Sequence, residues 1–93
     1  MASEVRRNDV EYRYELLIDG RLVGIADFHV DGSAVVVPHA EIEPGLRGQG
    51  LGAILVQGVL DDIRDAGRTV IPSCWYVRRY IDEHPGEADL LAG

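Results

Sequence analysis

The stretch Leu46-Arg47-Gly48-Gln49-Gly50-Leu51-Gly52 places three glycines within five positions, directly after an arginine. The segment before it ends near Ile42 and has the composition of a strand. The segment after it repeats apolar residues at helical spacing, namely Leu51, Leu55, Val59 and Ile63. A glycine turn between a strand and a helix presents backbone N–H groups to an anion at the positive end of the helix dipole. Arg47 can add charge-assisted hydrogen bonds to the same anion. The stretch therefore predicts an anion-binding turn.

The spacing of the glycines excludes two common phosphate-binding loops. Gly52 is followed by Ala53-Ile54, where a nucleoside-triphosphate loop needs lysine and then serine or threonine. The dinucleotide fingerprint Gly-x-Gly-x-x-Gly is absent as well. What remains is Arg47-x-x-Gly50-x-Gly52. This pattern resembles the pyrophosphate-binding signature of the GNAT superfamily of acetyl-CoA-dependent N-acetyltransferases.

Composition limits the classes of function. The 93 residues suffice for one domain, and 9 basic against 16 acidic residues give a formal charge of −7. This balance argues against general binding of nucleic acid or anionic membranes, which needs a positive field. It suits a cationic or amine substrate, although most acidic proteins are simply solvated.

The cellular compartment is inferred from the single cysteine and from two kinds of apolar segment that the sequence lacks. The single cysteine, Cys74, cannot form an intrachain disulfide, which fits a reducing compartment. No stretch reaches the roughly 18 apolar residues of a transmembrane helix. Residues 1–9 contain no apolar region of a signal peptide. We expect a cytoplasmic protein in which residues 1–9 are a flexible leader and residues 10–93 form one domain.

Alternation of apolar and polar residues predicts three strands in the first half of the chain. Asp-Gly pairs separate them, and this pair is a strong hairpin signal because both central residues of a type I′ turn need positive φ. The expected result is an antiparallel meander. The expected strands are Val10–Ile18, Arg21–Val30 and Ser33–Ile42, with turns at Asp19-Gly20 and Asp31-Gly32.

Pro38 lies within the third expected strand and cannot donate to a ladder, so we expect an edge or a bulge there. Simple alternation puts His39 and Glu41 on one face with Val35 and Val37.

The second half of the chain predicts a helix, a short strand and a second helix. The first helix covers Leu51–Ala66, with Gly67 as its C-terminal cap, and the strand covers Arg68–Ile71. A strand–helix–strand unit implies a parallel pair. Ser73 is expected to cap a helix over Cys74–Glu83, and residues 87–93 give no clear element.

The order of elements and two further segments extend the GNAT resemblance over nearly the whole chain. His39-Ala40-Glu41-Ile42 precedes the glycine turn, and a Cys-x-Tyr-Val-x-x-Tyr-Ile-x-x-His-Pro segment spans 74–85. Both are similar to a small, single-domain branch of the superfamily. The resemblance implies a minimal GNAT fold of the α/β (α+β) class, with an antiparallel three-stranded meander, a parallel crossover and a C-terminal helix. The additional N-terminal helices of larger relatives, which help build an acceptor pocket, are absent.

The resemblance also implies how acetyl-CoA is held. In the GNAT fold the two central parallel strands splay apart, and the pantetheine arm enters that gap as an added strand would. The main chain around Ile42 would hold the arm. The pyrophosphate would be held by Arg47 and by the amides of Gly48, Gln49, Gly50, Leu51 and Gly52. The alternative is an ordinary glycine-rich turn with a surface arginine.

Four side chains are candidates for the chemistry, each with a structural alternative. Glu41 is the first candidate for the general base, or else a solvated strand carboxylate. His39 can relay a proton near neutral pH, or make a structural hydrogen bond. Cys74 can carry an acetyl group at a helix N-terminus, or be a buried structural cysteine. Tyr80 can protonate the CoA sulfur, or pack on the sheet. Trp75 and Tyr76 are expected to fill the core or line the arm.

The sequence thus predicts an acetyl-CoA-dependent N-acetyltransferase whose amine acceptor attacks directly in a ternary complex. Two other classes stay open. One is a non-catalytic module that binds or senses acyl-CoA, and the other is a protein-interaction domain that binds no nucleotide.

Overall fold

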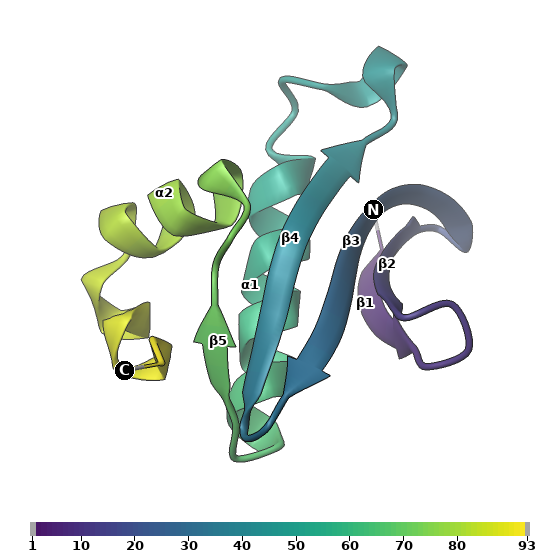
Figure 1. Ribbon diagram of the computed structural model, residues 1–93. Helices are drawn as coiled ribbons and strands as arrows, with labels where there is room; N and C mark the ends of the chain where they lie inside the picture. The colour runs from purple at the N-terminus through teal and green to yellow at the C-terminus, as the bar shows by residue number, and fades with distance from the viewer. Residues whose placement is uncertain (1, 93) are drawn as a thin grey trace.

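The computed structural model describes residues 2–92 and places a five-stranded sheet against two α-helices (Figure 1). The strands lie in chain order, β1-β2-β3-β4-β5; the first four are antiparallel, and β5 is parallel to β4. No helix in this part of the chain is long and apolar enough to cross a membrane. The elements are β1 Ser3–Asn8, β2 Arg13–Ile18, β3 Arg21–Asp31, β4 Ala34–Ile42, η1 Pro44–Leu46, α1 Leu51–Asp65, β5 Thr69–Ile71, α2 Trp75–Glu83 and η2 Pro85–Leu90.

The first predicted hairpin turn is confirmed. Asp19 and Gly20 both have positive φ, 49° and 83°, as a type I′ turn requires. The second turn lies one residue later than predicted. Strand β3 continues through Asp31, which pairs with Ala34, so Gly32 and Ser33 form the turn.

The expected flexible leader is wrong, because residues 3–8 form the edge strand β1. Its side chains are mostly exposed and polar, so the hydrophobic pattern does not reveal it. Val5 instead fits against Gly58 of α1, where an added β-carbon would come within 2.5 Å of the Val5 side chain. Cross-strand and helix contacts also hold Arg6 to Glu15 and Arg7 to Asp62.

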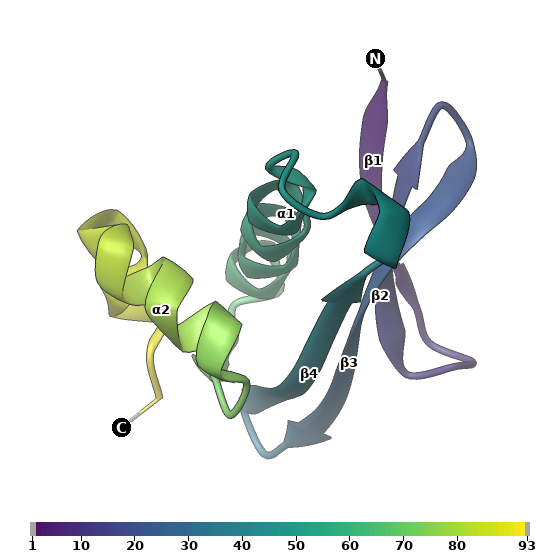
Figure 2. The same cartoon turned by 90° about the horizontal axis from the view of Figure 1, so that it is seen from above.

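The predicted amphipathic helix is confirmed as α1. Its apolar face packs on the sheet, and Gly67 follows its end with a φ of 69° and an N–H that donates to the Arg64 carbonyl at 3.0 Å. Figure 2 shows α1 and α2 on the same side of the sheet. The buried residues of α1 are Leu51, Leu55, Val56, Val59, Leu60 and Ile63.

The second helix begins one residue later than predicted and ends at Glu83, as predicted. Ser73 does not cap it; Cys74 occupies the N-cap position, and its side chain makes no capping hydrogen bond. After α2, the segment without a predicted element forms η2. Leu91 then bridges to Val70 of β5, so the C-terminal segment returns to the sheet.

Candidate functional site

A bulge in β4 shapes the site. Asp27 pairs with His39 and His29 pairs with Val36, so one residue of β3 faces two residues of β4. The two are Val37 and Pro38. The bulge predicted at Pro38 is therefore confirmed, at a position where proline cannot complete the ladder.

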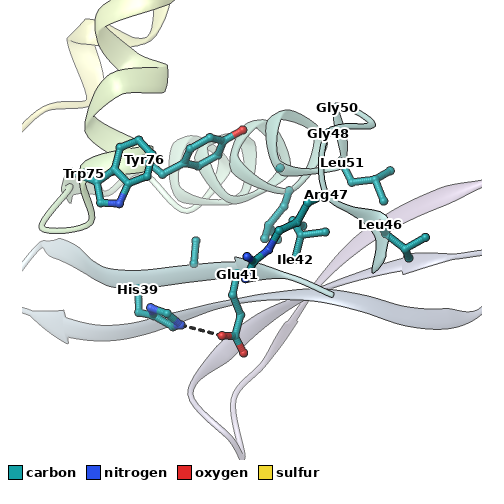
Figure 3. Close-up of a pocket in the computed structure, with 13 residues that line it drawn as sticks. His39, Glu41, Ile42, Leu46, Arg47, Gly48, Gly50, Leu51, Trp75 and Tyr76 are labelled. Atoms are coloured by element: carbon teal, nitrogen blue, oxygen red, sulfur yellow. Dashed lines mark hydrogen bonds and ion pairs between the residues drawn. The ribbon is translucent and has the colours of Figure 1, made fainter. Parts of the chain in front are cut away.

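The bulge reverses the alternation of the strand beyond it. Val35 and Val37 are in the core, and Ala40 and Ile42 pack against that same core. His39 and Glu41 therefore lie on the opposite face, each side chain 53% exposed. The prediction that they share a face with Val35 and Val37 is wrong, because one inserted residue shifts a two-residue period by half. Figure 3 shows both side chains leaving β4 on the side away from the helices.

The two central parallel strands separate beyond the bulge, as the resemblance implied. Pairing between β4 and β5 ends at Val36 and Ile71, and the last link is the Cys74 N–H, which donates to the Val37 carbonyl at 2.9 Å. A cavity of about 610 Å³ opens between β4 and the start of α2. Its lining residues are His39, Ala40, Glu41, Ile42, Leu46, Arg47, Gly48, Gly50, Leu51, Gly52, Leu55, Trp75 and Tyr76 (Figure 3).

The glycine turn forms one end of this cavity. Gly48 and Gly50 have φ of 83° and 78°, a conformation that L side chains rarely adopt. Within residues 2–92, no acceptor takes a hydrogen bond from the amides of Gly48 to Gly52, and Arg47 makes neither a hydrogen bond nor an ion pair. Unpaired amides at the start of a helix can cradle an anion, and the unpaired Arg47 lines the same cavity.

Tyr76 forms the wall opposite this turn. Its hydroxyl lies so close to Gly52 that an added β-carbon there would come within 2.6 Å of it. A side chain at position 52 would therefore force the Tyr76 ring to move. The sequence pattern identified this glycine through its spacing in the turn, whereas its contact with Tyr76 depends on the packing of the two helices.

The cavity brings together most of the predicted site residues. His39, Glu41, Ile42 and Arg47 line it, together with the turn residues Gly48, Gly50, Leu51 and Gly52. His39 Nε2 and Glu41 Oε2 lie 3.1 Å apart. Gln49 is outside the cavity and lines a separate hollow on the other side of the turn.

Two predicted catalytic side chains do not line the cavity. Cys74 is 7% exposed and belongs to the core. The Tyr80 hydroxyl donates to Gln57 Oε1 of α1. Desolvation by burial raises the pKa of Tyr80. The structure therefore places both groups in the packing between α2 and the rest of the molecule.

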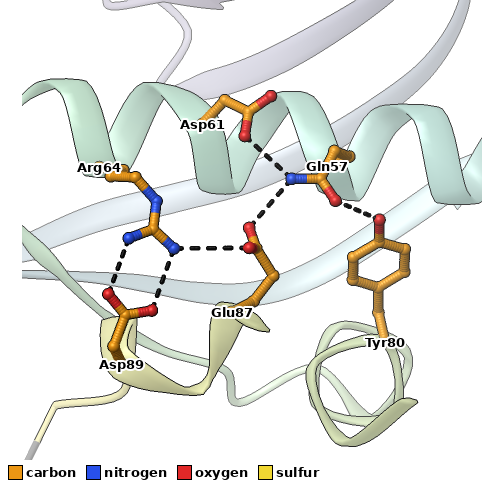
Figure 4. Close-up of polar contacts among 6 residues, drawn as sticks. All are labelled: Gln57, Asp61, Arg64, Tyr80, Glu87 and Asp89. Carbon is orange, nitrogen blue, oxygen red and sulfur yellow. Dashed lines mark hydrogen bonds and ion pairs between the residues drawn. The ribbon is translucent and has the colours of Figure 1, made fainter. Parts of the chain in front are cut away.

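Tyr80 belongs to a polar network that fixes the C-terminal segment (Figure 4). Gln57 Nε2 donates to Asp61 and Glu87 at 2.9 Å each. Arg64 donates to both carboxylate oxygens of Asp89, at 2.7 and 3.1 Å, and this contact lowers the pKa of Asp89. The network attaches η2 to α1 and so holds the far end of α2.

The first turn of α2 contributes more to the cavity lining than the sequence predicted. Tyr76 lines the cavity, which agrees with one of its two predicted roles, to line the arm or to fill the core. Trp75 does not fill the core; it is 71% exposed and also lines the cavity. Both follow the point where the parallel strands diverge, and this position at the end of β5 was the signal available in the sequence.

Comparison with known proteins agrees with this geometry. A family model described as GCN5-related N-acetyl-transferase matches residues 13–90, which covers four of the five strands and both α-helices. The chain belongs to this family. The match includes the splayed strands, the glycine turn and α2, so every element that lines the cavity lies within the family domain.

Known proteins match the chain at low sequence identity. Protein NATD1 of Gallus gallus is 28% identical over 57 residues, and the match covers 61% of this chain and 52% of that protein. The chain thus spans about half the length of the curated relatives it matches. A GCN5-like putative N-acetyltransferase from Staphylococcus aureus superposes with a TM-score of 0.72 at 20% identity, covering 97% of this chain and 88% of that one. A GNAT family acetyltransferase from Brucella melitensis, solved in complex with acetyl-CoA, gives a TM-score of 0.57 at 21% identity, covering 73% and 50%.

Proposed function

We propose that the protein transfers an acetyl group from acetyl-CoA to an amine by direct attack. The observation that carries this proposal is one cavity that runs from an unpaired anion cradle at Gly48–Gly52 along β4, the strand that carries the hydrogen-bonded pair of Glu41 and His39 on its other face. Membership of the N-acetyltransferase family supports the reaction class. The complex of the Brucella melitensis relative with acetyl-CoA supports the donor.

The residues present suit acetyl-CoA at both ends of the cavity. Arg47 and the amides of the glycine turn would hold the pyrophosphate. Beyond Val36, β4 has no partner strand on its β5 side within residues 2–92, so its main chain up to Ile42 can pair with an extended amide-containing arm. When bound, the thioester supplies an activated acetyl group.

Glu41 and His39 would accept the proton that the acceptor amine loses. An amine attacks only in its neutral form, so a group beside it must accept a proton. Glu41 and His39 are hydrogen-bonded to each other at 3.1 Å and are open on the sheet face opposite the helices. Because the donor lies in the cavity on the other side of β4, the pair would take up the proton of the amine through a water molecule rather than by direct contact.

Two observations support direct transfer and change the identity of the candidate acid. Cys74 is in the core and does not line the cavity, so an acetyl-cysteine intermediate has no access to the donor there. The hydroxyl of Tyr76 lies at the cavity, whereas that of Tyr80 is held by Gln57. Tyr76 is accordingly our candidate for the donor of a proton to the leaving thiolate.

A second candidate function is a module that binds or senses acyl-CoA without turnover. The observation that favours it is the exposure of His39 and Glu41, because a catalytic base is usually shielded from water.

Calorimetry and a turnover assay separate these functions. CoA binding is measured first, followed by release of free thiol from acetyl-CoA with a panel of amines and peptides. Glu41→Gln should lower turnover by about 10²–10⁴-fold while CoA affinity is unchanged. Glu11→Gln, an exposed carboxylate in the turn before β2, is the matched control. Binding of CoA without turnover of any amine would establish the sensing module, and no binding of CoA would leave an interaction domain.

A further inference from the structure

Strand β1 has one edge without a partner strand. Within residues 2–92 it pairs only with β2. It lies at the edge of the sheet opposite β5 and α2, away from the cavity of the candidate site (Figures 1 and 2). An unpaired edge presents a row of N–H and C=O groups to which another strand can bind. This edge is therefore a candidate interaction surface.

The alternation of an antiparallel ladder shows which residues of β1 face the free edge. The Asp19 N–H donates to the carbonyl of Ala2, the residue before β1, at 2.8 Å. Hydrogen-bonded and non-hydrogen-bonded pairs alternate along such a ladder, so the even-numbered residues of β1 bond to β2. The odd-numbered residues turn their N–H and C=O groups to the free edge. They are Ser3, Val5 and Arg7.

Two charged side chains of β1 have bonding capacity left on the sheet face opposite the helices. Glu4 is exposed and makes no hydrogen bond or ion pair with the described part of the chain. Arg6 is 55% exposed and contacts Glu15 through Nε alone, at 2.9 Å. Its two terminal nitrogens have no partner within residues 2–92. Glu4 and Arg6 share a face because they are two residues apart on one strand.

A second copy of β1 in antiparallel orientation matches these charges in one register. The odd-numbered residues of both copies must face one another, so the two-fold axis can pass through Glu4, Val5 or Arg6. An axis at Glu4 or at Arg6 places that residue opposite the same charge in the second copy. An axis at Val5 places each Glu4 opposite Arg6 of the second copy. Opposite charges directly across a ladder attract, whereas like charges there are destabilising.

The helix side of the edge has room for this pairing. Val5 lies against Gly58 of α1, and a hollow of about 650 Å³ that both residues line runs between β1 and α1. With the axis at Val5, the valine of the second copy is directly opposite and its side chain lies on the same side of the joined sheet. Arg7 of the second copy lies opposite Ser3, another residue of the hollow. It brings a positive charge to a hollow whose lining includes Asp61 and Asp65.

We propose that β1 pairs with β1 of a second copy about a two-fold axis at Val5, which joins the two sheets into one. The surface is distinct from the candidate site and does not depend on the proposed function. Both cavities stay open, because they lie toward the outer edges of the joined sheet. The formal charge of −7 on each copy opposes association. Salt screens this repulsion beyond about 8 Å at physiological ionic strength, whereas the pairs of Glu4 and Arg6 are in contact.

Sedimentation equilibrium of the full chain, from micromolar to millimolar concentration, tests the dimer and its register. The mass should rise from that of one chain to that of two. Glu4→Arg places an arginine opposite Arg6 in both pairs, so the Kd of the dimer should rise about 10-fold or more. Glu4 has no other partner in the described chain, and circular dichroism should confirm that the variant folds.

Two further variants control for charge alone. Glu11→Arg makes the same change of charge at an exposed position in the turn between β1 and β2, so the Kd should stay within about twofold of wild type. Glu4→Gln keeps an acceptor for Arg6 of the second copy, so the Kd should rise less than about fivefold.

Hydrogen exchange of single amides, followed by NMR, gives a second readout. The amides of Val5 and Arg7 gain a partner only in the dimer, whereas those of Glu4 and Arg6 already bond to β2. Raising the protein concentration should slow exchange at Val5 and Arg7 by about 10-fold or more, and at Glu4 and Arg6 much less.

Three results would overturn the inference. The first is a protein that stays monomeric at every concentration, which would leave the edge to a different partner. The second is an equal change of Kd in Glu4→Arg and Glu11→Arg, which would make net charge the cause. The third is association without added protection of Val5 and Arg7, which would assign the dimer to another surface. CoA binding and turnover are measured separately, so the proposed function can stand or fail by itself.

Discussion

The hydroxyl of Tyr76 lies over the α-carbon of Gly52, at a point where an added β-carbon would be 2.6 Å from the oxygen. The two residues join the first turns of α2 and α1 across the cavity. Their contact implies that the cavity tolerates no side chain at position 52 without movement of Tyr76. Because the obstructing atom is the end of a side chain, the expected change is local.

Gly52→Ala should therefore affect binding and stability in opposite directions. Alanine in a helix is more favourable than glycine by about 0.5–1 kcal/mol, so the free energy of unfolding should be unchanged or higher. CoA affinity should fall, because the displaced Tyr76 side chain would narrow the cavity. Calorimetry and urea unfolding measure the two quantities. Gly45→Ala is the control, since a β-carbon there meets nothing within 4 Å. Unchanged CoA affinity in Gly52→Ala would place the ligand elsewhere.

In the proposed function, Arg47 provides the charged contact to the pyrophosphate. Arg47→Ala should weaken CoA binding by about 1–3 kcal/mol, the range for losing a partner of a charged group. The remaining affinity should depend less on salt concentration, because one ionic contact has been removed. Arg79→Ala removes an arginine of α2 that pairs with Glu83 and is not among the residues that line the cavity, so it should leave CoA affinity as it is. An equal loss in both variants would indicate a general effect of net charge.

The two tyrosines of α2 should respond differently to loss of the hydroxyl. Tyr76→Phe should lower kcat by about 10-fold or more with little effect on unfolding, if its hydroxyl donates the proton. Tyr80→Phe should keep kcat within about twofold and lower the free energy of unfolding by about 0.5–1.5 kcal/mol, since it loses the hydrogen bond to Gln57. Steady-state kinetics and urea unfolding of both variants decide the matter. The reverse assignment would return the role of acid to Tyr80.

Cys74 should remain unmodified during transfer. Its thiol is buried in the core, and its main-chain N–H donates to the Val37 carbonyl of β4. Cys74→Ala should thus keep most of the turnover and lose about 1 kcal/mol of stability through the lost packing. Intact-protein mass spectrometry after incubation with acetyl-CoA alone should show no acetyl adduct. Rapid formation of an adduct that an amine then discharges would establish a two-step route.

Glu15 should make stability depend on pH at the acid end. Its carboxylate is on a residue only 3% exposed and accepts hydrogen bonds from Arg6 and Arg13 at 2.9 Å each. The bond from Arg6 is the largest cause that lowers the pKa of Glu15. A carboxylate with a lowered pKa stabilises fully above its unfolded-state value, about 4.3, and this contribution disappears as pH falls through the lower folded-state value.

Glu15→Gln should accordingly lower the free energy of unfolding by about 1–3 kcal/mol near pH 7. The difference from wild type should shrink as pH falls below about 4, where the native carboxylate begins to take up a proton. Urea unfolding over a pH series measures it. Glu4→Gln, at an exposed position of the same sheet edge, should change stability little at any pH. A difference that stays constant down to pH 2 would show that shape, not charge, holds Glu15.

The sequence by itself determined most of the local elements and the glycine turn at one end of the cavity. These features depend on the residues themselves and on their neighbours in the sequence. They are the positive φ at Gly20 and Gly67, the apolar face of α1, the missing backbone N–H of Pro38 and the free amides after Arg47. The glycine spacing also pointed to the family, because glycine is the residue that readily adopts the positive φ of positions 48 and 50.

Tertiary structure alone decided which side chains meet at the acceptor end. A bulge predicted at Pro38 did not say which face His39 and Glu41 would occupy, since that depends on how β4 pairs with β3 beyond it. Tyr76 rather than Tyr80 reaches the cavity because Gln57 holds the latter against α1. The edge strand β1 was hidden for a similar reason. Its polar residues carry almost no hydrophobic pattern, and its place is set by partners that lie far away in the sequence.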